Sequence, residues 1–257
     1  MKYFIVGILA LLFGLSGCAV SGKRSGTTPA SVAPASEATD FASAPVQKTN
    51  DPLERFNRTI FAFNDTVNTH VVRPVAHDYV LIVPGPARTG ISNFFDNLGF
   101  PVRFVNCVLQ GKFVRSAQET GKFVLNSIWG IGGLIRISDH VPSLADVPAE
   151  DFGQTLGVWG LPPGPYIVIP LLGPSDCRDL VGFVGDYALY PLNWYPLGII
   201  HHTFVTNAVL IALSATRFVN GLPKAIDTYD QMKSAAVDPY IAIRDGYLSY
   251  RAAQIKK

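Results

Sequence analysis

Charged side chains are scarce in this sequence. Asp, Glu, Lys and Arg make up 16% of its 257 residues, against about 25% in an ordinary soluble domain. The 21 basic residues nearly balance the 19 acidic ones, so no charge excess favours nucleic acid or a polybasic membrane patch. Two long windows, 152–175 and 187–216, contain none of the four charged types. Such windows form either a large core or a surface with one side facing lipid.

Signatures of catalysis are also lacking. The chain has no G-x-S-x-G elbow, no P-loop and no zinc-ligand spacing, so neither a lipase-type serine nor an ATP-driven step is indicated. His201 and His202 are adjacent and would point about 100° apart on a helix, which makes them poor joint metal ligands. Asp176 and Asp179 flank Arg178 and indicate a structural ion pair or cap. We therefore expect no enzyme, no metal and no cofactor.

Only three cysteines are present, and the first is placed for lipidation. Lys2 precedes an apolar run at 4–13, which is typical of a secretory signal and too short to span a bilayer comfortably. Leu15-Ser16-Gly17-Cys18 has the small residues of a bacterial lipobox, in which the thiol of Cys18 takes a diacylglycerol. An ordinary signal peptide with a chance cysteine is the alternative. Ala19 is not the aspartate that often retains lipoproteins in the inner membrane, which favours the outer membrane.

The other two cysteines allow two states. In the oxidising compartment that a signal peptide implies, Cys107 and Cys177 are permitted to form a disulfide. Both lie in apolar sequence, so two buried free thiols are the alternative.

The chain divides into three parts. Residues 1–17 are the predicted lipoprotein signal peptide, and residues 18–49 are the lipidated cysteine with a Ser-, Ala-, Thr- and Pro-rich tether. The tether cannot build a core and would span roughly 30 Å as a flexible coil. Residues 50–257 are long enough for one domain.

An amphipathic helix opens this domain. Asp51-Pro52 is a start signal, since Asp can cap a helix and Pro suits its first turn. Apolar residues then recur at the helical spacings of three and four, at Leu53, Phe56, Ile60, Phe63, Val67 and Val71. We expect Pro74 to stop this helix. Asp238-Pro239 repeats the start signal for a last helix.

The middle of the chain is predicted to be mainly helical. Helices are expected at 86–97, 101–110 (stopped by Gly111), 115–129, 149–159, 175–188 (capped by Ser175) and 198–219, with one strand in 166–172 that Pro170 confines to an edge. The segment 198–216 is long enough to be a spanning candidate, but its polar residues favour short helices that lie within one leaflet. A soluble bundle with an apolar core is the alternative.

Ordered motifs across residues 51–250 resemble one known family, the MlaA/VacJ lipoproteins. They are 51–58 (DPLERFNR), 73–76 (RPVA), 86–94 (PARTGISNF), 105–106, 109–111, 125–128 with Gly130, Gly132 and Gly133, 152–157 (FGQTLG), 164–173, 178–179 and 238–240. The tether is long for the family, and 194–219 matches weakly, so lining residues there are not assigned.

The resemblance implies a mainly α fold with little or no β, in which short amphipathic helices form a ring partly embedded in the inner leaflet of the outer membrane. Porin trimers would hold the ring. Its polar-lined channel would remove phospholipids mislocalised in the outer leaflet and pass them to a soluble periplasmic carrier. The alternatives are a phospholipid-modifying enzyme of the outer membrane and a structural envelope lipoprotein.

Two groups of residues are candidates for the channel. Asn57, Asn64 and Asn68 either present amides to the passage or secure neighbouring backbone, and surface or capping amides are the alternative. Gly130, Gly132 and Gly133 are a hinge or close-packing point for a gating segment, with a plain helix stop as the alternative.

Overall fold

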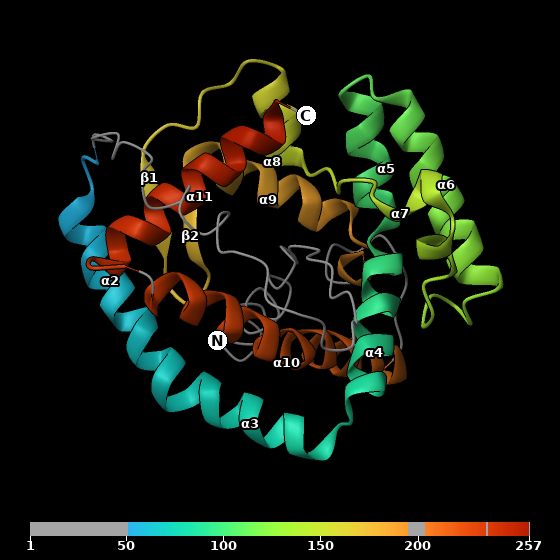
Figure 1. Cartoon of the computed structure of the whole chain (residues 1–257), viewed down its shortest axis with the longest axis horizontal. Coiled ribbons are helices and arrows are strands. Elements are labelled where there is room, and N and C mark those ends of the chain that lie inside the picture. The colour runs from blue at the N-terminus through green and yellow to red at the C-terminus, as the bar shows by residue number, and fades with distance from the viewer. Residues whose placement is uncertain (1–50, 195–203, 235, 257) are drawn as a thin grey trace, which may run out of the picture.

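The computed structural model describes residues 51–194, 204–234 and 236–256. The predicted signal peptide, Cys18, the tether and His201-His202 lie outside the described residues. Within them the chain is mainly helical and has only two short strands (Figure 1). The predicted mainly α fold is confirmed.

The helices follow one another closely, and most are short. The first half contains α2 (Glu54–Val67), the π-helical turn η1 (Asn68–Val72), α3 (Arg73–Ile82), α4 (Gly85–Leu98), α5 (Phe100–Leu109) and α6 (Phe113–Ile128). The second half contains η2 (Ile137–His140), α7 (Pro142–Ala145), α8 (Phe152–Val158), β1 (Tyr166–Ile169), β2 (Gly173–Asp176), α9 (Cys177–Leu189), η3 (Pro191–Asn193), α10 (Phe204–Ser234) and α11 (Pro239–Ile255). Gly111, with φ +72°, ends α5 as predicted.

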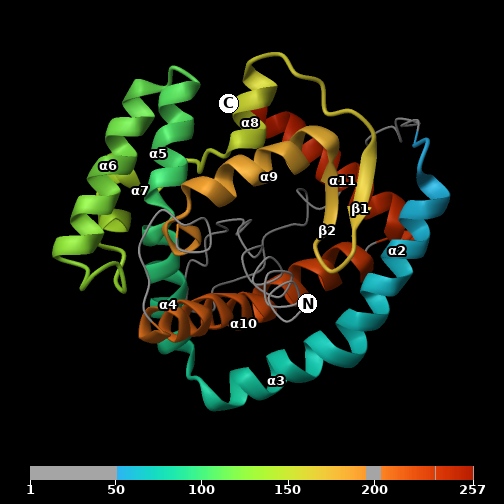
Figure 2. The same cartoon turned by 180° about the vertical axis from the view of Figure 1, so that it is seen from behind.

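The described elements are arranged as a ring (Figures 1 and 2). α2 and α3 form its outer arc, and α3 and α4 both contact α10. α10 continues to α11, which packs against α8, and α8 packs against α9. The hairpin of β1 and β2 contacts α2 through β1 and α11 through β2. The two ends of the described chain therefore meet at this hairpin and close the ring.

The prediction that Pro74 stops the first helix is wrong. α2 runs into η1, where the N–H of Arg73 bonds to the carbonyl of Asn68 five residues back, and α3 follows with Pro74 in its first turn. A proline ring clashes with the carbonyl four residues before it in an α-helix, and the wider π turn makes room for the ring. The helical path therefore continues to Ile82.

α10 is longer than predicted. It runs for 31 residues from Phe204 to Ser234, with Pro223 inside it, and so passes the predicted end at Val219. Within the described chain, Ala208–Ser234 is the one helix long and apolar enough to cross a membrane by length and composition. The helix continues past the predicted end because Pro223 removes a single backbone hydrogen bond and the flanking turns continue. That this segment lies within one leaflet stays a prediction.

The two strands form one antiparallel hairpin. Tyr166 lies opposite Asp176, and Ile169 lies opposite Gly173. The predicted strand is confirmed for its first four residues, whereas β2 is unpredicted because Gly and Pro disfavour strands. Pro174 is tolerated there because both strands of a two-stranded sheet are edges.

The start of α9 differs from the prediction by one residue. Asp176, and not Ser175, is the N-cap, since its carboxylate accepts a hydrogen bond of 2.8 Å from the N–H of Asp179. Ser175 pairs in β2 instead. Either side chain can cap a helix, so the strand register decides between them.

Candidate functional site

The interior of the ring wall is rich in polar side chains. Among the described residues, 17 buried ones are polar or charged, and 11 are hydrophobic. Asn57, Glu119 and Asp176 are fully buried. Soluble domains bury mostly apolar side chains, so this interior is unusual.

Large hydrophobic side chains lie on the outside instead. Phe56 and Phe63 of the predicted apolar stripe are 50% and 49% exposed, whereas the neighbouring Asn57 is 0% exposed. Other strongly exposed side chains are Val71, Leu81, Ile82, Phe113, Val114, Ile128, Trp129, Ile131, Trp159, Val181 and Val184. We call this combination of buried polar side chains and exposed apolar ones the inverted wall. Exposed apolar surface of this extent marks contact with lipid or another protein.

Two of the predicted asparagines hold the backbone of the hairpin. The amide of Asn57 donates to the carbonyl of Tyr166 at 3.0 Å and accepts from the N–H of Val168 at 2.9 Å. The amide of Asn64 repeats this at Ile169 and Leu171, at 3.0 and 2.7 Å. An asparagine offers both a donor and an acceptor, so each amide replaces the strand partner that β1 lacks on this side.

Asn68 lies one turn further along. It is half-buried and begins the π turn η1. The spacing of Asn57, Asn64 and Asn68 therefore places all three along the same helical path, in which the π turn begins at the third.

The glycine cluster forms a tight turn after α6. Gly132 and Gly133 have positive φ, +67° and +96°, a region that favours glycine. A Cβ at Gly133 would lie 2.6 Å from the Cβ of Asn97 on α4, whereas one at Gly132 would meet no atom within 4 Å. A Cβ at Gly130 would lie 2.1 Å from the carbonyl oxygen of Ile135. Close packing therefore needs Gly130 and Gly133, and backbone conformation needs Gly132.

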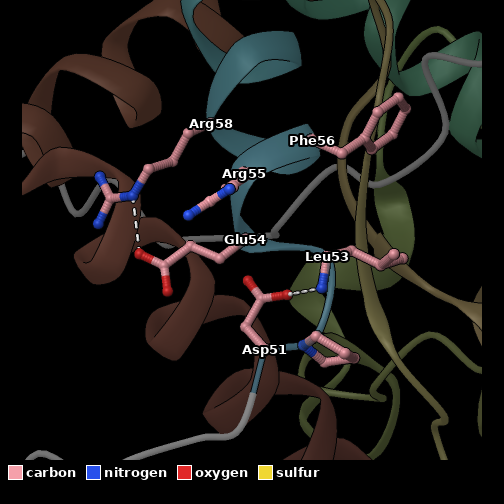
Figure 3. A pocket seen from close by; sticks show the side chains of 7 residues that line it. Asp51, Leu53, Glu54, Arg55, Phe56 and Arg58 are labelled. Carbon is pink, nitrogen blue, oxygen red and sulfur yellow. Dashed lines mark hydrogen bonds and ion pairs between the residues drawn. The ribbon is translucent and has the colours of Figure 1, made fainter.

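The family-like segment 51–58 closes the ring against α11. Arg58 donates to Glu54 and to Asp238, the N-cap of α11, each at 2.8 Å. The hydroxyl of Tyr240 donates to Asp51. A surface cavity of about 590 Å³ is lined by Asp51, Pro52, Leu53, Glu54, Arg55, Phe56 and Arg58 (Figure 3). Because most of the charged side chains around this cavity pair with each other or with α11, we assign the segment a role in ring closure.

A buried ion-pair cluster joins α8, α9 and α11. Arg251 donates to Asp151 at 2.6 and 2.9 Å and to Asp179 at 2.8 Å. The hydroxyl of Tyr247 donates to Asp179 at 2.5 Å. Burial alone would raise the pKa of Asp151, but the hydrogen bonds and charge of Arg251 lower it below its usual value. The predicted pairing of Arg178 with Asp176 and Asp179 is also present, at 3.3 and 3.1 Å.

One half-buried carboxyl, that of Asp186, has no cationic hydrogen-bond partner in the described chain. Asp186 accepts from the amide of Asn106 at 3.0 Å and from the N–H of Phe152 at 2.9 Å. Burial, followed by the charge of Asp151, raises the pKa of Asp186 to about 7. A raised carboxyl pKa is one mark of catalytic acids, but both hydrogen bonds that Asp186 accepts come from groups of the ring wall.

The two cysteines of the described chain are both free thiols. Cys107 is buried and Cys177 is exposed, and both are free, so neither the disulfide nor the pair of buried thiols is correct. Burial raises the pKa of Cys107 to about 11, which makes it a poor nucleophile. Within the described residues, no group of three or more His, Cys, Asp or Glu side chains could hold a metal ion.

Sequence reasoning missed the long-range partners of this polar interior. Arg251, Asp186 and Glu119 stand in ordinary helical sequence, and each finds its partners on a different element. The low content of charged residues was the one signal that could have indicated these contacts. In a chain with so few charges, each charged side chain is a candidate for an ion pair.

Comparisons with known proteins agree on one family. The model of the family described as MlaA lipoprotein matches residues 49–254. The chain is 36% identical over 204 residues to the intermembrane phospholipid transport system lipoprotein MlaA of Shigella flexneri, covering 78% of this chain and 76% of the relative. The protein of the same name from Escherichia coli is 35% identical with the same coverage. An uncharacterised protein of Rickettsia typhi is 31% identical over 207 residues, covering 80% of this chain and 78% of the relative.

A solved structure has the same fold. It is described as the structural basis for maintenance of bacterial outer membrane lipid asymmetry, and it aligns with a TM-score of 0.65 and 36% sequence identity. The alignment covers 80% of this chain and 99% of that chain.

Proposed function

Because this chain belongs to the MlaA lipoprotein family, we propose that it is an outer-membrane lipoprotein of intermembrane phospholipid transport. It removes phospholipids that are mislocalised in the outer leaflet and passes them to a soluble periplasmic lipid carrier. The relatives from Shigella flexneri and Escherichia coli carry the name of that transport system.

The inverted wall is the observation that carries this proposal. A soluble ring would bury Phe56 and Phe63 and expose Asn57, and this chain does the opposite. Apolar side chains on the outer arc gain about 25 cal/mol per Å² on leaving water, so the ring lies within the inner leaflet. A charged headgroup crosses hydrocarbon only at great cost unless polar groups accompany it, and a polar-lined passage through the ring removes that barrier.

The candidate residues take specific parts in this passage. Asn57 and Asn64 hold the β1 backbone in the wall, and Asn68 sets the bend of the outer arc at η1. Gly130, Gly132 and Gly133 form the turn that moves when the passage opens. The step is passive: the higher free energy of the lipid in the wrong leaflet drives it, and the carrier removes the product.

Cys18 anchors the chain from the periplasmic side. Its acyl chains insert into the membrane, and the tether connects them to the ring. Porin trimers hold the ring in place. A porin would contact the part of the exposed apolar surface that is not covered by lipid.

The test compares outer-leaflet phospholipid in cells with and without the protein. Loss of the protein should raise outer-leaflet phospholipid, and the wild-type chain should restore asymmetry. Cys18→Ala at equal abundance should restore little, because the ring is no longer anchored. Unchanged asymmetry on loss would favour the structural envelope lipoprotein, and release of labelled lipid product by the purified protein would favour the enzyme.

A further inference from the structure

Arg88 on α4 has no counterion among the residues that the structure describes. In the part of the chain that the structure describes, its guanidinium makes no hydrogen bond or ion pair, and its Nε is buried without an acceptor. The first turn of α4 carries no acidic residue. A buried donor without a partner is expensive, so this position favours a ligand that supplies acceptor oxygens.

The neighbouring side chains hold Arg88 in place. Asn220 on α10 donates to the backbone carbonyl of Arg88 at 3.1 Å and to the hydroxyl of Ser92 at 2.8 Å. It also accepts from the hydroxyl of Tyr79 on α3 at 2.6 Å. Three helices therefore meet at Arg88, and no carboxylate belongs to this set. We call it the Arg88 junction.

A second cation, Arg217, lies on α10, three residues before Asn220. The guanidinium of Arg217 stacks on the ring of Tyr190, with its Cζ 4.0 Å from the centroid. No carboxylate in the described chain pairs with it. Residues three apart on a helix share a face, so Arg217 adds a second positive charge near the junction.

An apolar groove lies between α3 and α10. Its volume is about 330 Å³, and it is lined by Arg73, Ala76, His77, Val80, Pro223, Ile226 and Asp227. The two helices run antiparallel, since Arg73 pairs with Asp230 at one end and Tyr79 with Asn220 at the other. Val80 and Pro223 lie next to the Tyr79–Asn220 contact in sequence, so the groove leads towards Arg88. Leu81 and Ile82, 72% and 79% exposed, flank this end.

We propose that the Arg88 junction binds the phosphate group of a phospholipid whose acyl chain occupies the groove between α3 and α10. Guanidinium groups bind phosphate through charge-assisted hydrogen bonds, and an apolar groove suits a hydrocarbon chain. An acidic side chain of a partner protein would satisfy Arg88 but would leave the groove empty. The inference rests on the proposed function and names a place where the transported lipid meets a fixed charge.

The experiment measures lipid binding by the full-length lipoprotein purified in a neutral detergent. Labelled phosphatidylglycerol is titrated against the wild type, Arg88→Gln, Arg88→Lys and Arg55→Gln. Arg55 is the matched control because it is an exposed arginine on α2, whereas the junction is formed by α3, α4 and α10. Arg88→Gln should bind about tenfold more weakly, Arg88→Lys should recover part of the loss, and Arg55→Gln should bind as the wild type.

Two further arms identify the ligand chemistry. Diacylglycerol with the same acyl chains lacks the phosphate, so Arg88→Gln should leave its binding unchanged. Inorganic phosphate should compete only weakly, because it lacks the acyl chain. Full competition by inorganic phosphate, or equal binding of phosphatidylglycerol by wild type and Arg88→Gln, would overturn the inference. Thermal unfolding of each variant confirms that it is folded.

These results separate the inference from the function. If loss of the protein disturbs lipid asymmetry in cells and Arg88→Gln binds phosphatidylglycerol normally, the site is wrong and the function stands. If loss of the protein leaves asymmetry unchanged, the function fails whatever Arg88 binds.

Discussion

Arg251, near the end of α11, donates to both carboxylate oxygens of Asp151, which lies 100 residues earlier before α8, at 2.6 and 2.9 Å. The same guanidinium also reaches Asp179 on α9. One side chain therefore ties three elements of the ring together. The described residues bury more polar and charged side chains than hydrophobic ones, so we expect such buried pairs to contribute strongly to keeping the ring closed.

Arg251→Met should destabilise the fold strongly. It leaves the carboxylates of Asp151 and Asp179 buried without their main cation, and the expected loss is about 3–5 kcal/mol in the free energy of unfolding. Denaturation of the purified protein in neutral detergent measures the loss.

Arg58→Met is the control for that experiment. It breaks a pair with Asp238 in which both side chains are more than a third exposed, so the expected loss is below about 1 kcal/mol. If both variants lose the same free energy of unfolding, the Arg251 cluster does not stabilise the ring more than the exposed Arg58–Asp238 pair.

Asn57→Ala should remove a backbone anchor of β1. The change leaves the carbonyl of Tyr166 and the N–H of Val168 buried without partners, which is expected to destabilise the protein by about 2–3 kcal/mol. Asn57→Asp should not restore stability, because a carboxylate cannot donate to the carbonyl.

Thr59→Ala on the exposed side of α2 serves as the matched control, with an expected change within about 0.5 kcal/mol. Its hydroxyl bonds only to the carbonyl of Arg55 within the same helix. If Asn57→Ala unfolds no more easily than Thr59→Ala, the amide does not support the hairpin.

Local signals predicted most helix positions, and the reasons are visible in single residues. Gly111 ends α5 through its positive φ, and Asp238 caps α11 by accepting from the N–H groups of Tyr240 and Ile241. The helix end at Gly111 and the helix start at Asp238 each depend on a few adjacent residues, so both can be predicted from the local sequence.

Features that depend on distant partners could not be predicted. Pro74 does not stop its helix because the π turn before it makes room for the proline ring. No local sequence pattern predicts that turn. The spacing that groups Phe56 with Phe63 predicts an amphipathic helix, but it does not say whether the apolar face turns inward or outward. The outward orientation follows from the amides of Asn57 and Asn64 finding β1, more than 100 residues away.

Asp186→Asn should change the pH dependence of stability. The carboxyl has a pKa of about 7 in the folded protein, against an ordinary value of 3.8. Between about pH 4 and pH 7 the folded state keeps a proton that the unfolded state releases, so the free energy of unfolding falls as pH rises through this window. Asparagine keeps the acceptor oxygen but does not ionise.

The variant should therefore be more stable than the wild type at about pH 8, on the order of 2 kcal/mol, and the difference should shrink at about pH 5. Chemical denaturation of both proteins at the two pH values measures it. A difference that stays constant with pH would show that Asp186 titrates normally.

At Gly132, in the turn after α6, the effect of backbone conformation can be tested without a packing clash. Gly132→Val places a β-branched residue at φ +67° in open space, so it strains the backbone without a clash. Gly132→Asn is the matched control, because asparagine tolerates this region. If the turn moves when the passage opens, Gly132→Val should raise outer-leaflet phospholipid in cells, and Gly132→Asn should behave nearly as the wild type. Both variants must accumulate to normal levels for the comparison. Normal lipid asymmetry with Gly132→Val would mean that the turn only ends α6, and the gating proposal would fail.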